Sequence, residues 1–185
     1  KKKINKRYFN KNSLKIISVG RLTDQKDHLT LLKSVKLIHT KYNPHIIIIG
    51  KGKNYNLLNN YIKNNNLQNN VKLTGYIKNP FIYIKQSDIL VLSSRFEGLP
   101  NILQEAQFLK KYIISTDCPT GPKEILMNGK CGDLFKIKDY KKLARLINNY
   151  PKNKKEIFKK IKIGYKNFYR YDYNHNCKKY LHFVS

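Results

Sequence analysis

Two glutamates separated by seven residues, Glu97 and Glu105, stand on either side of the start of an expected helix. Gly98 allows a tight turn close to a ligand, and Pro100 suits the first helical position, where its missing N–H group costs nothing. The free N–H groups of residues 101–103 then form an anion pocket at the positive end of the helix dipole. The chemistry indicated is phosphate binding beside carboxylates that accept hydrogen bonds from sugar hydroxyls. A capping glutamate and an ordinary surface glutamate are the alternative.

Glycines and charged residues directly follow four of the apolar runs. They stand in the segments Gly20-Arg21, Gly50-Lys51-Gly52, Gly75-Tyr76 and Arg95-Phe96-Glu97-Gly98. In open sheets of parallel strands, ligands bind beyond the carboxyl ends of the strands, so these segments are expected to share one edge. The alternatives are a plain turn at each strand end for the glycines and a half-buried aromatic for the tyrosine.

These segments need elements to position them, and the chain alternates short β-branched runs with amphipathic stretches. This alternation predicts an α/β fold with a parallel sheet, right-handed crossovers and flanking helices. The expected strands are residues 15–20, 45–50, 71–75, 89–93, 112–116 and 133–136. The expected helices are residues 26–42, 55–66, 80–86, 100–110, 123–127, 139–150, 152–169 and 173–183.

Composition limits the class of protein. The 185 residues are enough for one domain with a hydrophobic core, and 41% hydrophobic residues argue against wholesale disorder. Three cysteines without a metal-ligand spacing support neither a disulfide framework nor a zinc site, and a reducing compartment fits best. The net charge of +27 indicates a surface that attracts nucleotide diphosphates, anionic lipids or nucleic acid. General drift of surface positions towards lysine is the alternative.

Five strings, taken in order, resemble the C-terminal domain of the retaining family 4 glycosyltransferases, also called group 1 glycosyl transferases. The strings are Val19–Asp27, Ile49–Gly52, Val71–Tyr76, Ser87–Ser94 and Ser94–Ala106, and the resemblance covers about residues 15–150. It implies the C-terminal half of a two-domain GT-B enzyme. That half would be a Rossmann-like parallel sheet of about six strands with helices on both faces.

The resemblance also implies three catalytic positions. Arg21 and Lys26 would clamp the donor diphosphate and stabilise the leaving nucleotide as negative charge develops. Glu97 would contact the hydroxyls of the donor sugar near the reacting carbon. The family needs no metal or other cofactor, and the chain carries no Asp-x-Asp metal motif.

The donor itself would contact a wider set of positions. The resemblance implies Gly20, Gly52, Tyr76, Ile77, Gly98, Leu99, Asn101 and Glu105. Glu105 would accept hydrogen bonds from the ribose, and backbone groups of residues 76–77 would frame the base. The N–H groups of residues 98, 99 and 101 would hold phosphate or sugar.

We therefore expect residues 1–14 to be a linker from a missing N-terminal acceptor domain, 15–168 the nucleotide-sugar-binding domain, and 169–185 a tail helix. The expected function is transfer of a hexose or N-acetylhexosamine from a UDP-sugar to a glycan or lipid-linked acceptor. The enzyme would be cytoplasmic, with peripheral contact to an anionic membrane.

Two other functions compete with this expectation. The chain could be a non-catalytic donor-binding module or a truncated relic of a transferase, because so little sequence precedes the first expected strand. Nucleic-acid binding is suggested by the charge and by 12% aromatic residues. No RNA- or DNA-binding motif is present, so no specific nucleic-acid partner is expected.

Overall fold

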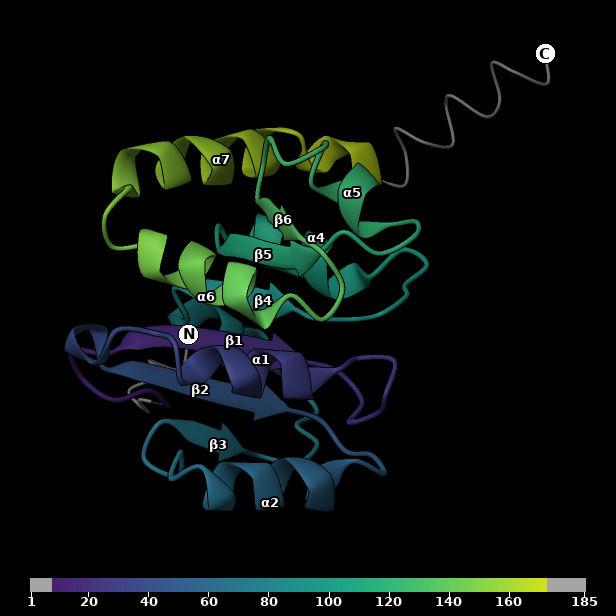
Figure 1. Ribbon diagram of the computed structural model, residues 1–185. Helices are drawn as coiled ribbons and strands as arrows, with labels where there is room; N and C mark the ends of the chain where they lie inside the picture. Colours follow the sequence, from purple (N-terminus) through teal and green to yellow (C-terminus); the bar gives the residue numbers. More distant parts are fainter. Residues whose placement is uncertain (1–7, 173–185) are drawn as a thin grey trace, which may run out of the picture.

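A computed structural model describes residues 8–172 and shows one six-stranded sheet in which every strand pair is parallel. The strands are β1 (Leu14–Val19), β2 (Pro44–Ile49), β3 (Val71–Leu73), β4 (Ile89–Leu92), β5 (Tyr112–Thr116) and β6 (Asp133–Phe135). Their order across the sheet is β3-β2-β1-β4-β5-β6 (Figure 1). The fold class expected from the sequence is confirmed.

Helices cover both faces of this sheet (Figure 1). One face carries α1 (His28–Val35), α2 (Tyr55–Asn64) and α6 (Tyr140–Asn149). The other carries α3 (Phe81–Gln86), α4 (Asn101–Phe108) and α5 (Pro122–Ile125). The longest helix among the described residues, α7 (Lys154–Lys166), packs against α4 and β5 beyond the β6 end of the sheet. Short 3₁₀ turns form at η1 (Thr40–Tyr42) and η2 (Phe168–Tyr171).

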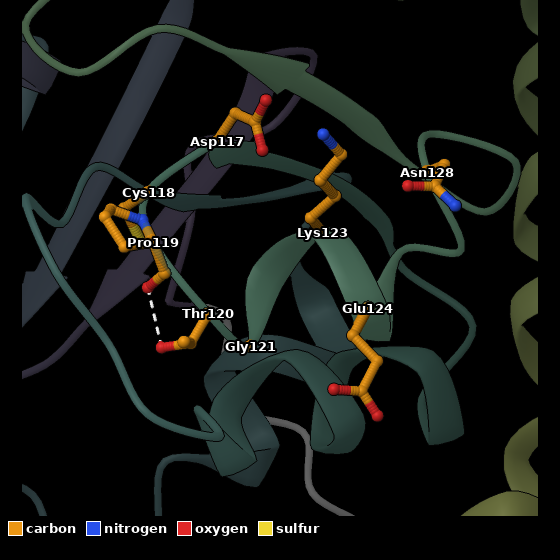
Figure 2. A pocket seen from close by; sticks show the side chains of 8 residues that line it. All are labelled: Asp117, Cys118, Pro119, Thr120, Gly121, Lys123, Glu124 and Asn128. Carbon is orange, nitrogen blue, oxygen red and sulfur yellow. Dashed lines mark hydrogen bonds between the residues drawn. The ribbon is translucent and has the colours of Figure 1, made fainter.

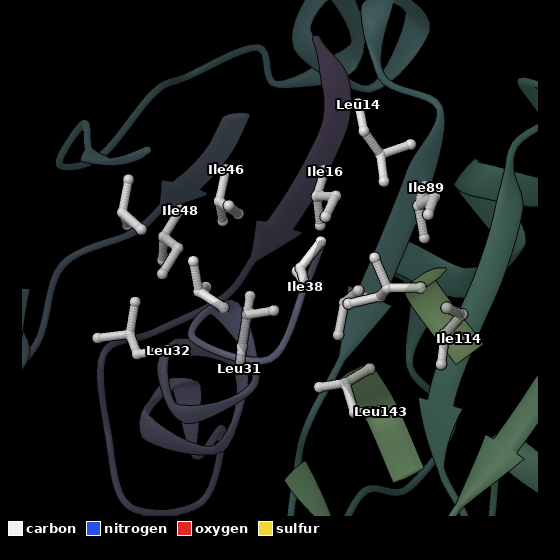
Figure 3. Packing of buried hydrophobic residues seen from close by; sticks show 14 of the residues in the cluster. Leu14, Ile16, Leu31, Leu32, Ile38, Ile46, Ile48, Ile89, Ile114 and Leu143 are labelled. Atoms are coloured by element: carbon white, nitrogen blue, oxygen red, sulfur yellow. The ribbon is translucent and has the colours of Figure 1, made fainter. Parts of the chain in front are cut away.

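The core forms two layers because successive side chains of a strand point to opposite faces. Ile16, Ile46 and Ile48 belong to the layer under α1, α2 and α6. Figure 3 shows these three side chains in one layer with Leu31 of α1 and Leu143 of α6. Ile17 and Ile47 lie on the other face, against α3, α4 and α5. Both layers are apolar, so β1 and β2 are hydrophobic along nearly their whole length, as expected of strands covered on two sides.

Two helix boundaries differ from the expectation. The helix expected over 26–42 is α1 and, after a break, the 3₁₀ turn η1, because Asp27 adopts a left-handed backbone (φ 42°) before α1 and the chain turns after Lys36. Lys26 therefore lies in a loop. Pro100 is the N-cap of α4 rather than its first helical residue, since its ψ of 101° is extended. The first helical residue of α4 is Asn101.

The two ends of the chain bear on the expected domain division, which stays a prediction. Phe9, in the expected linker, is buried in the same layer as Ile17 and Ile47. The expected helix over 152–169 is α7 followed by η2. The helix expected over 173–183, and most of the expected tail, lie outside the described residues. Within residues 8–172, no helix has both the length and the apolar character needed to cross a bilayer.

Candidate functional site

The site is built where the strand order reverses. β1 and β4 are neighbours, with Ile16 opposite Ile89 and Ile17 opposite Leu90. The chain leaves β1 towards α1 on one face and leaves β4 towards α4 on the other. Such a switch point opens a crevice at the carboxyl ends of the strands, and ligands bind there in α/β sheets. Two loops lie at this switch point, residues 20–27 after β1 and residues 93–100 after β4.

Hydrogen bonds join these two loops directly. The Arg95 N–H donates to Gln25 O (2.7 Å), and Gln25 Nε2 donates to Phe96 O (3.1 Å). The buried Ser93 hydroxyl donates to Lys26 O (3.1 Å). We call this set of contacts the loop junction. It fixes the two loops relative to each other, so the side chains that they carry share one geometry.

Lys26 and Glu97 meet at the centre of the loop junction. Lys26 Nζ lies 2.5 Å from Glu97 Oε1, and the Ser94 hydroxyl donates to the same oxygen at 2.5 Å. The Lys26 side chain is only 16% exposed, and the Glu97 side chain is only 7% exposed. A carboxylate so nearly buried must be paired and hydrogen-bonded to remain charged at low cost. The structure thus brings together two of the three residues expected to be catalytic.

Close backbone contacts join the loops that follow β1 and β2. The Gly20 N–H donates to Ile49 O (2.9 Å), and the Lys26 side chain packs over Gly20. Gly52 lies against the backbone of Leu22. Gly20 and Gly52 therefore hold the β1 and β2 loops together in this domain, whatever contact they also make with a donor.

The loop after β5 supports the β4–α4 loop from the other side. Thr120 Oγ1 donates to Glu97 O (2.5 Å). A Cβ placed on Gly121 would lie 1.7 Å from Gly98 O, so only glycine fits there. An open hollow of about 700 Å³ lies on the outer side of this loop, lined by Asp117, Cys118, Pro119, Thr120, Gly121, Lys123, Glu124 and Asn128 (Figure 2). None of the site residues expected from the sequence lines this hollow.

The first turn of α4 follows the β4–α4 loop, and a second hollow lies along this helix. Asn101 and Glu105 are one turn apart and line an open hollow of about 740 Å³ with Phe81 and Phe108. Burial raises the pKa of the Glu105 carboxyl above its ordinary value. The Leu103 N–H is bonded to the Pro100 carbonyl, so only the first two helical residues of α4 can offer N–H groups to a ligand.

Most of the other expected site residues lie in loops after the strands and are exposed to solvent. Arg21 is exposed and forms no ion pair with any of residues 8–172. Tyr76, Gly98 and Leu99 are also exposed. The Ile77 side chain instead packs on the core layer beside α3, which leaves its backbone as the part able to frame a base.

His28 lies beneath the β1–α1 loop and is buried. Its Nδ1 lies 3.3 Å from Ser18 Oγ, and burial lowers its pKa from 6.5 to about 4. His28 Nε2 and Thr23 Oγ1 have no hydrogen-bond partner among the described residues, and both residues line a small, partly open pocket of about 130 Å³. A polar cavity of this size can hold ordered water. His28 therefore supports the loop as a neutral side chain.

Acid should weaken the domain through His28. Its folded pKa is lower than its unfolded pKa, so the unfolded chain binds the proton first as pH falls below about 6.5. Above pH 6.5 His28 is neutral in both states and does not lower the free energy of unfolding. Between pH 6.5 and pH 4 that free energy falls by about 3 kcal/mol through this group. Urea titrations of the wild type and His28→Asn across this range should show a steeper loss for the wild type. Parallel curves would contradict the assignment.

Among residues 8–172, no cluster of three or more His, Cys, Asp or Glu side chains is arranged to hold a metal ion. The expectation that no metal is needed stays a prediction.

Comparison of the sequence with known families identifies the family of this chain. The sequence model of the family described as glycosyl transferases group 1 matches residues 1–167. The chain belongs to that family. An uncharacterized glycosyltransferase of Methanocaldococcus jannaschii is 48% identical over 126 residues, which are 66% of this chain and 31% of that protein.

Two further proteins are similar to this glycosyl transferase domain, one in sequence and one in structure. The N-acetylgalactosamine-N,N'-diacetylbacillosaminyl-diphospho-undecaprenol 4-alpha-N-acetylgalactosaminyltransferase of Campylobacter jejuni is 28% identical, covering 80% of this chain and 44% of that enzyme. A mutant form of S. aureus TarM, solved with fondaparinux, alpha-GlcNAc-glycerol and UDP, superposes with a TM-score of 0.82 at 22% identity. That match covers 93% of this chain and 36% of TarM. The domain thus spans less than half the length of each of these relatives.

Sequence reasoning missed part of the site in this glycosyl transferase domain. It assigned no role to Gln25, Ser93 or Thr120, whose hydrogen bonds set the loop geometry. Ser94 and Arg95 stood inside the motif that revealed the family, without a stated function. Their position directly after a buried strand was the available signal.

Proposed function

We propose that this domain binds a nucleotide-sugar donor, a UDP-hexose or UDP-N-acetylhexosamine, for retaining transfer to a glycan or lipid-linked acceptor. One observation carries the proposal: the Lys26–Glu97 pair lies at the switch point of the sheet, directly before the first turn of α4. A cation and free N–H groups suit a diphosphate, and a carboxylate suits sugar hydroxyls.

The Lys26–Glu97 pair leaves capacity for a ligand. A lysine ammonium has three N–H donors, so Lys26 can bond a phosphate while it stays paired with Glu97. Lys26 and Ser94 both donate to Oε1 of Glu97. No hydrogen bond from residues 8–172 reaches Oε2, which is therefore available to accept a hydroxyl of the donor sugar.

Arg21 and Gly98 complete the proposed diphosphate site. The exposed Arg21 supplies a second cation, which would stabilise the charge that develops on the leaving nucleotide. A Cβ on Gly98 would meet nothing within 4 Å, so packing within the domain does not require glycine there. A ligand that approaches the backbone closely is a reason for glycine at this position.

The choice of UDP and of acceptor rests on the relatives. TarM was solved with UDP, and the Campylobacter enzyme is named for a diphospho-undecaprenol acceptor. An amylovoran biosynthesis glycosyltransferase of Erwinia amylovora is 34% identical over 64% of this chain. These names support a surface-polysaccharide or glycoconjugate product.

Calorimetric titration tests the donor site. The chain is titrated with UDP, UDP-sugars, GDP and ADP at moderate salt, and UDP should bind more tightly than GDP or ADP. Arg21→Ala should weaken UDP binding by roughly 100-fold through the loss of a charge-assisted phosphate contact. Lys33→Ala, an exposed lysine on α1, should leave affinity unchanged. Equal weakening by both variants, or equal affinity for every nucleotide, would reject the proposal.

Transfer is tested separately, because the domain spans less than half of its relatives. Labelled UDP-sugars are incubated with undecaprenol-diphosphate-linked acceptors in two reactions. One reaction contains this chain alone, and the other contains a form of the protein that is as long as its relatives. UDP binding without transfer in either form would support the alternative of a non-catalytic donor-binding module.

The pH dependence of UDP binding should show whether the Glu105 carboxylate contacts the ribose of UDP. Only the ionised carboxylate accepts hydrogen bonds from both ribose hydroxyls, and burial raises its pKa. Affinity should therefore fall as pH drops through this raised pKa, beyond the change caused by titration of UDP itself. Glu105→Gln should bind about tenfold more weakly at neutral pH and lose the extra dependence. Identical pH profiles for the two proteins would remove Glu105 from the site.

A further inference from the structure

The outward face of α7 is basic and aromatic along its whole length. We call the residues of this face the α7 stripe: Lys155, Phe158, Lys159, Lys162, Tyr165 and Lys166. They recur at intervals of three and four positions, so they share one side of the helix. Ile157 and Gly164, on the opposite side, are buried. In Figure 1, α7 forms the outermost layer at the top of the fold.

The aromatic members of the stripe are poorly covered by protein. Phe158 is 67% exposed and Tyr165 is 43% exposed. Lys110 of the α4–β5 turn holds its ammonium 4.2 Å from the centre of the Tyr165 ring. Two-thirds of the Phe158 side chain is therefore open to a partner, beside the ring of Tyr165 on the same face.

The charge of α7 is strongly one-sided. The helix contains six lysines and one glutamate, Glu156, which lies 3.6 Å from Lys159 with both side chains exposed. Two of the six turn away from the stripe: Lys160 pairs with Asp133, and Lys154 covers the Tyr150 ring. Lys155, Lys162 and Lys166 form no ion pair with any of residues 8–172. Three of the four stripe lysines therefore have no acidic partner among the described residues, and the fourth, Lys159, lies beside the exposed Glu156.

We propose that the α7 stripe is a docking face for the surface of an anionic lipid bilayer. Lysines near an anionic bilayer are attracted to its lipid phosphates, and aromatic rings on the same face fit among the headgroups. Single-stranded nucleic acid is bound in grooves, whereas this stripe is the outer face of one helix. The proposal does not depend on the donor site, because no stripe residue lines the crevice.

A tryptophan reporter tests which face meets the membrane. The chain contains no tryptophan, so Phe158→Trp and Leu37→Trp each create a single probe, the second on an exposed turn after α1. On vesicles of phosphatidylcholine with phosphatidylglycerol, the probe at 158 should shift to the blue and be quenched by brominated lipid. The probe at 37 should show no blue shift and no quenching. Vesicles of pure phosphatidylcholine should change the fluorescence of neither probe. Binding without a shift at 158 would overturn the proposal.

Matched lysine variants separate the stripe from general attraction by the net charge. Lys155→Ser/Lys159→Ser/Lys162→Ser should weaken vesicle binding roughly 100-fold at low salt. The control Lys33→Ser/Lys63→Ser/Lys72→Ser removes the same charge from other exposed positions and should weaken it less than about fivefold. Equal losses would overturn the proposal. So would a lipid-independent shift at 158 with dimer formation, or a shift only with RNA. UDP affinity should be the same in both triple variants.

Discussion

Lys26→Ala is expected to abolish measurable UDP binding and to lower the free energy of unfolding by about 3 kcal/mol. The alanine removes the cation 2.5 Å from Glu97 Oε1 and leaves a carboxylate that is only 7% exposed with the Ser94 hydroxyl as its partner. It also removes one of the two cations proposed to hold the diphosphate. Calorimetry with UDP and urea unfolding measure the two effects separately.

A paired variant separates these two roles of Lys26. In Lys26→Met/Glu97→Gln neither side chain is charged and both keep their approximate volume, so most of the lost stability should return. UDP binding should not return, because the methionine cannot donate to a phosphate. If the double variant bound UDP as the wild type does, the pair would be structural and the proposed diphosphate site would be wrong.

The second large effect is expected from Gly121→Ala. Gly121 has φ 71°, and an added Cβ would lie 1.7 Å from Gly98 O and 2.8 Å from Pro100 Cδ. Backbone atoms cannot rotate away as a side-chain end can, so the loop that carries Glu97 must move. We expect a loss of about 2–4 kcal/mol in stability and of about tenfold in UDP affinity.

Gly129→Ala is the matched control for this substitution. Gly129 also has a positive φ, 88°, but its added Cβ would meet nothing closer than 3.8 Å. It should cost only the strain of a left-handed alanine, about 1 kcal/mol, with unchanged UDP affinity. Equal effects of the two alanines would mean that the contact between Gly121 and Gly98 does not position the site.

The sequence predicted the elements better than their ends. Period-two and helical patterns depend on local spacing, so all six strands appear close to the expected ranges. Helix ends depend on backbone conformations that tertiary contacts select. Asp27 is left-handed where the loop junction holds Lys26 by its carbonyl, and Pro100 is extended where Gly121 packs against it.

The same division applies to the site. Motifs along the chain revealed the family and named Arg21, Lys26 and Glu97, because the residue types that bind phosphate and sugar are few and their spacing is characteristic. Nothing in the linear pattern states that Lys26 and Glu97 touch, since they are 71 positions apart. Their contact follows from β1 and β4 being neighbours, and strand order is decided by which packing buries both faces of the sheet. The sequence by itself therefore determined the family and predicted the site residues, whose roles stay a proposal. The tertiary structure alone decided which of them meet.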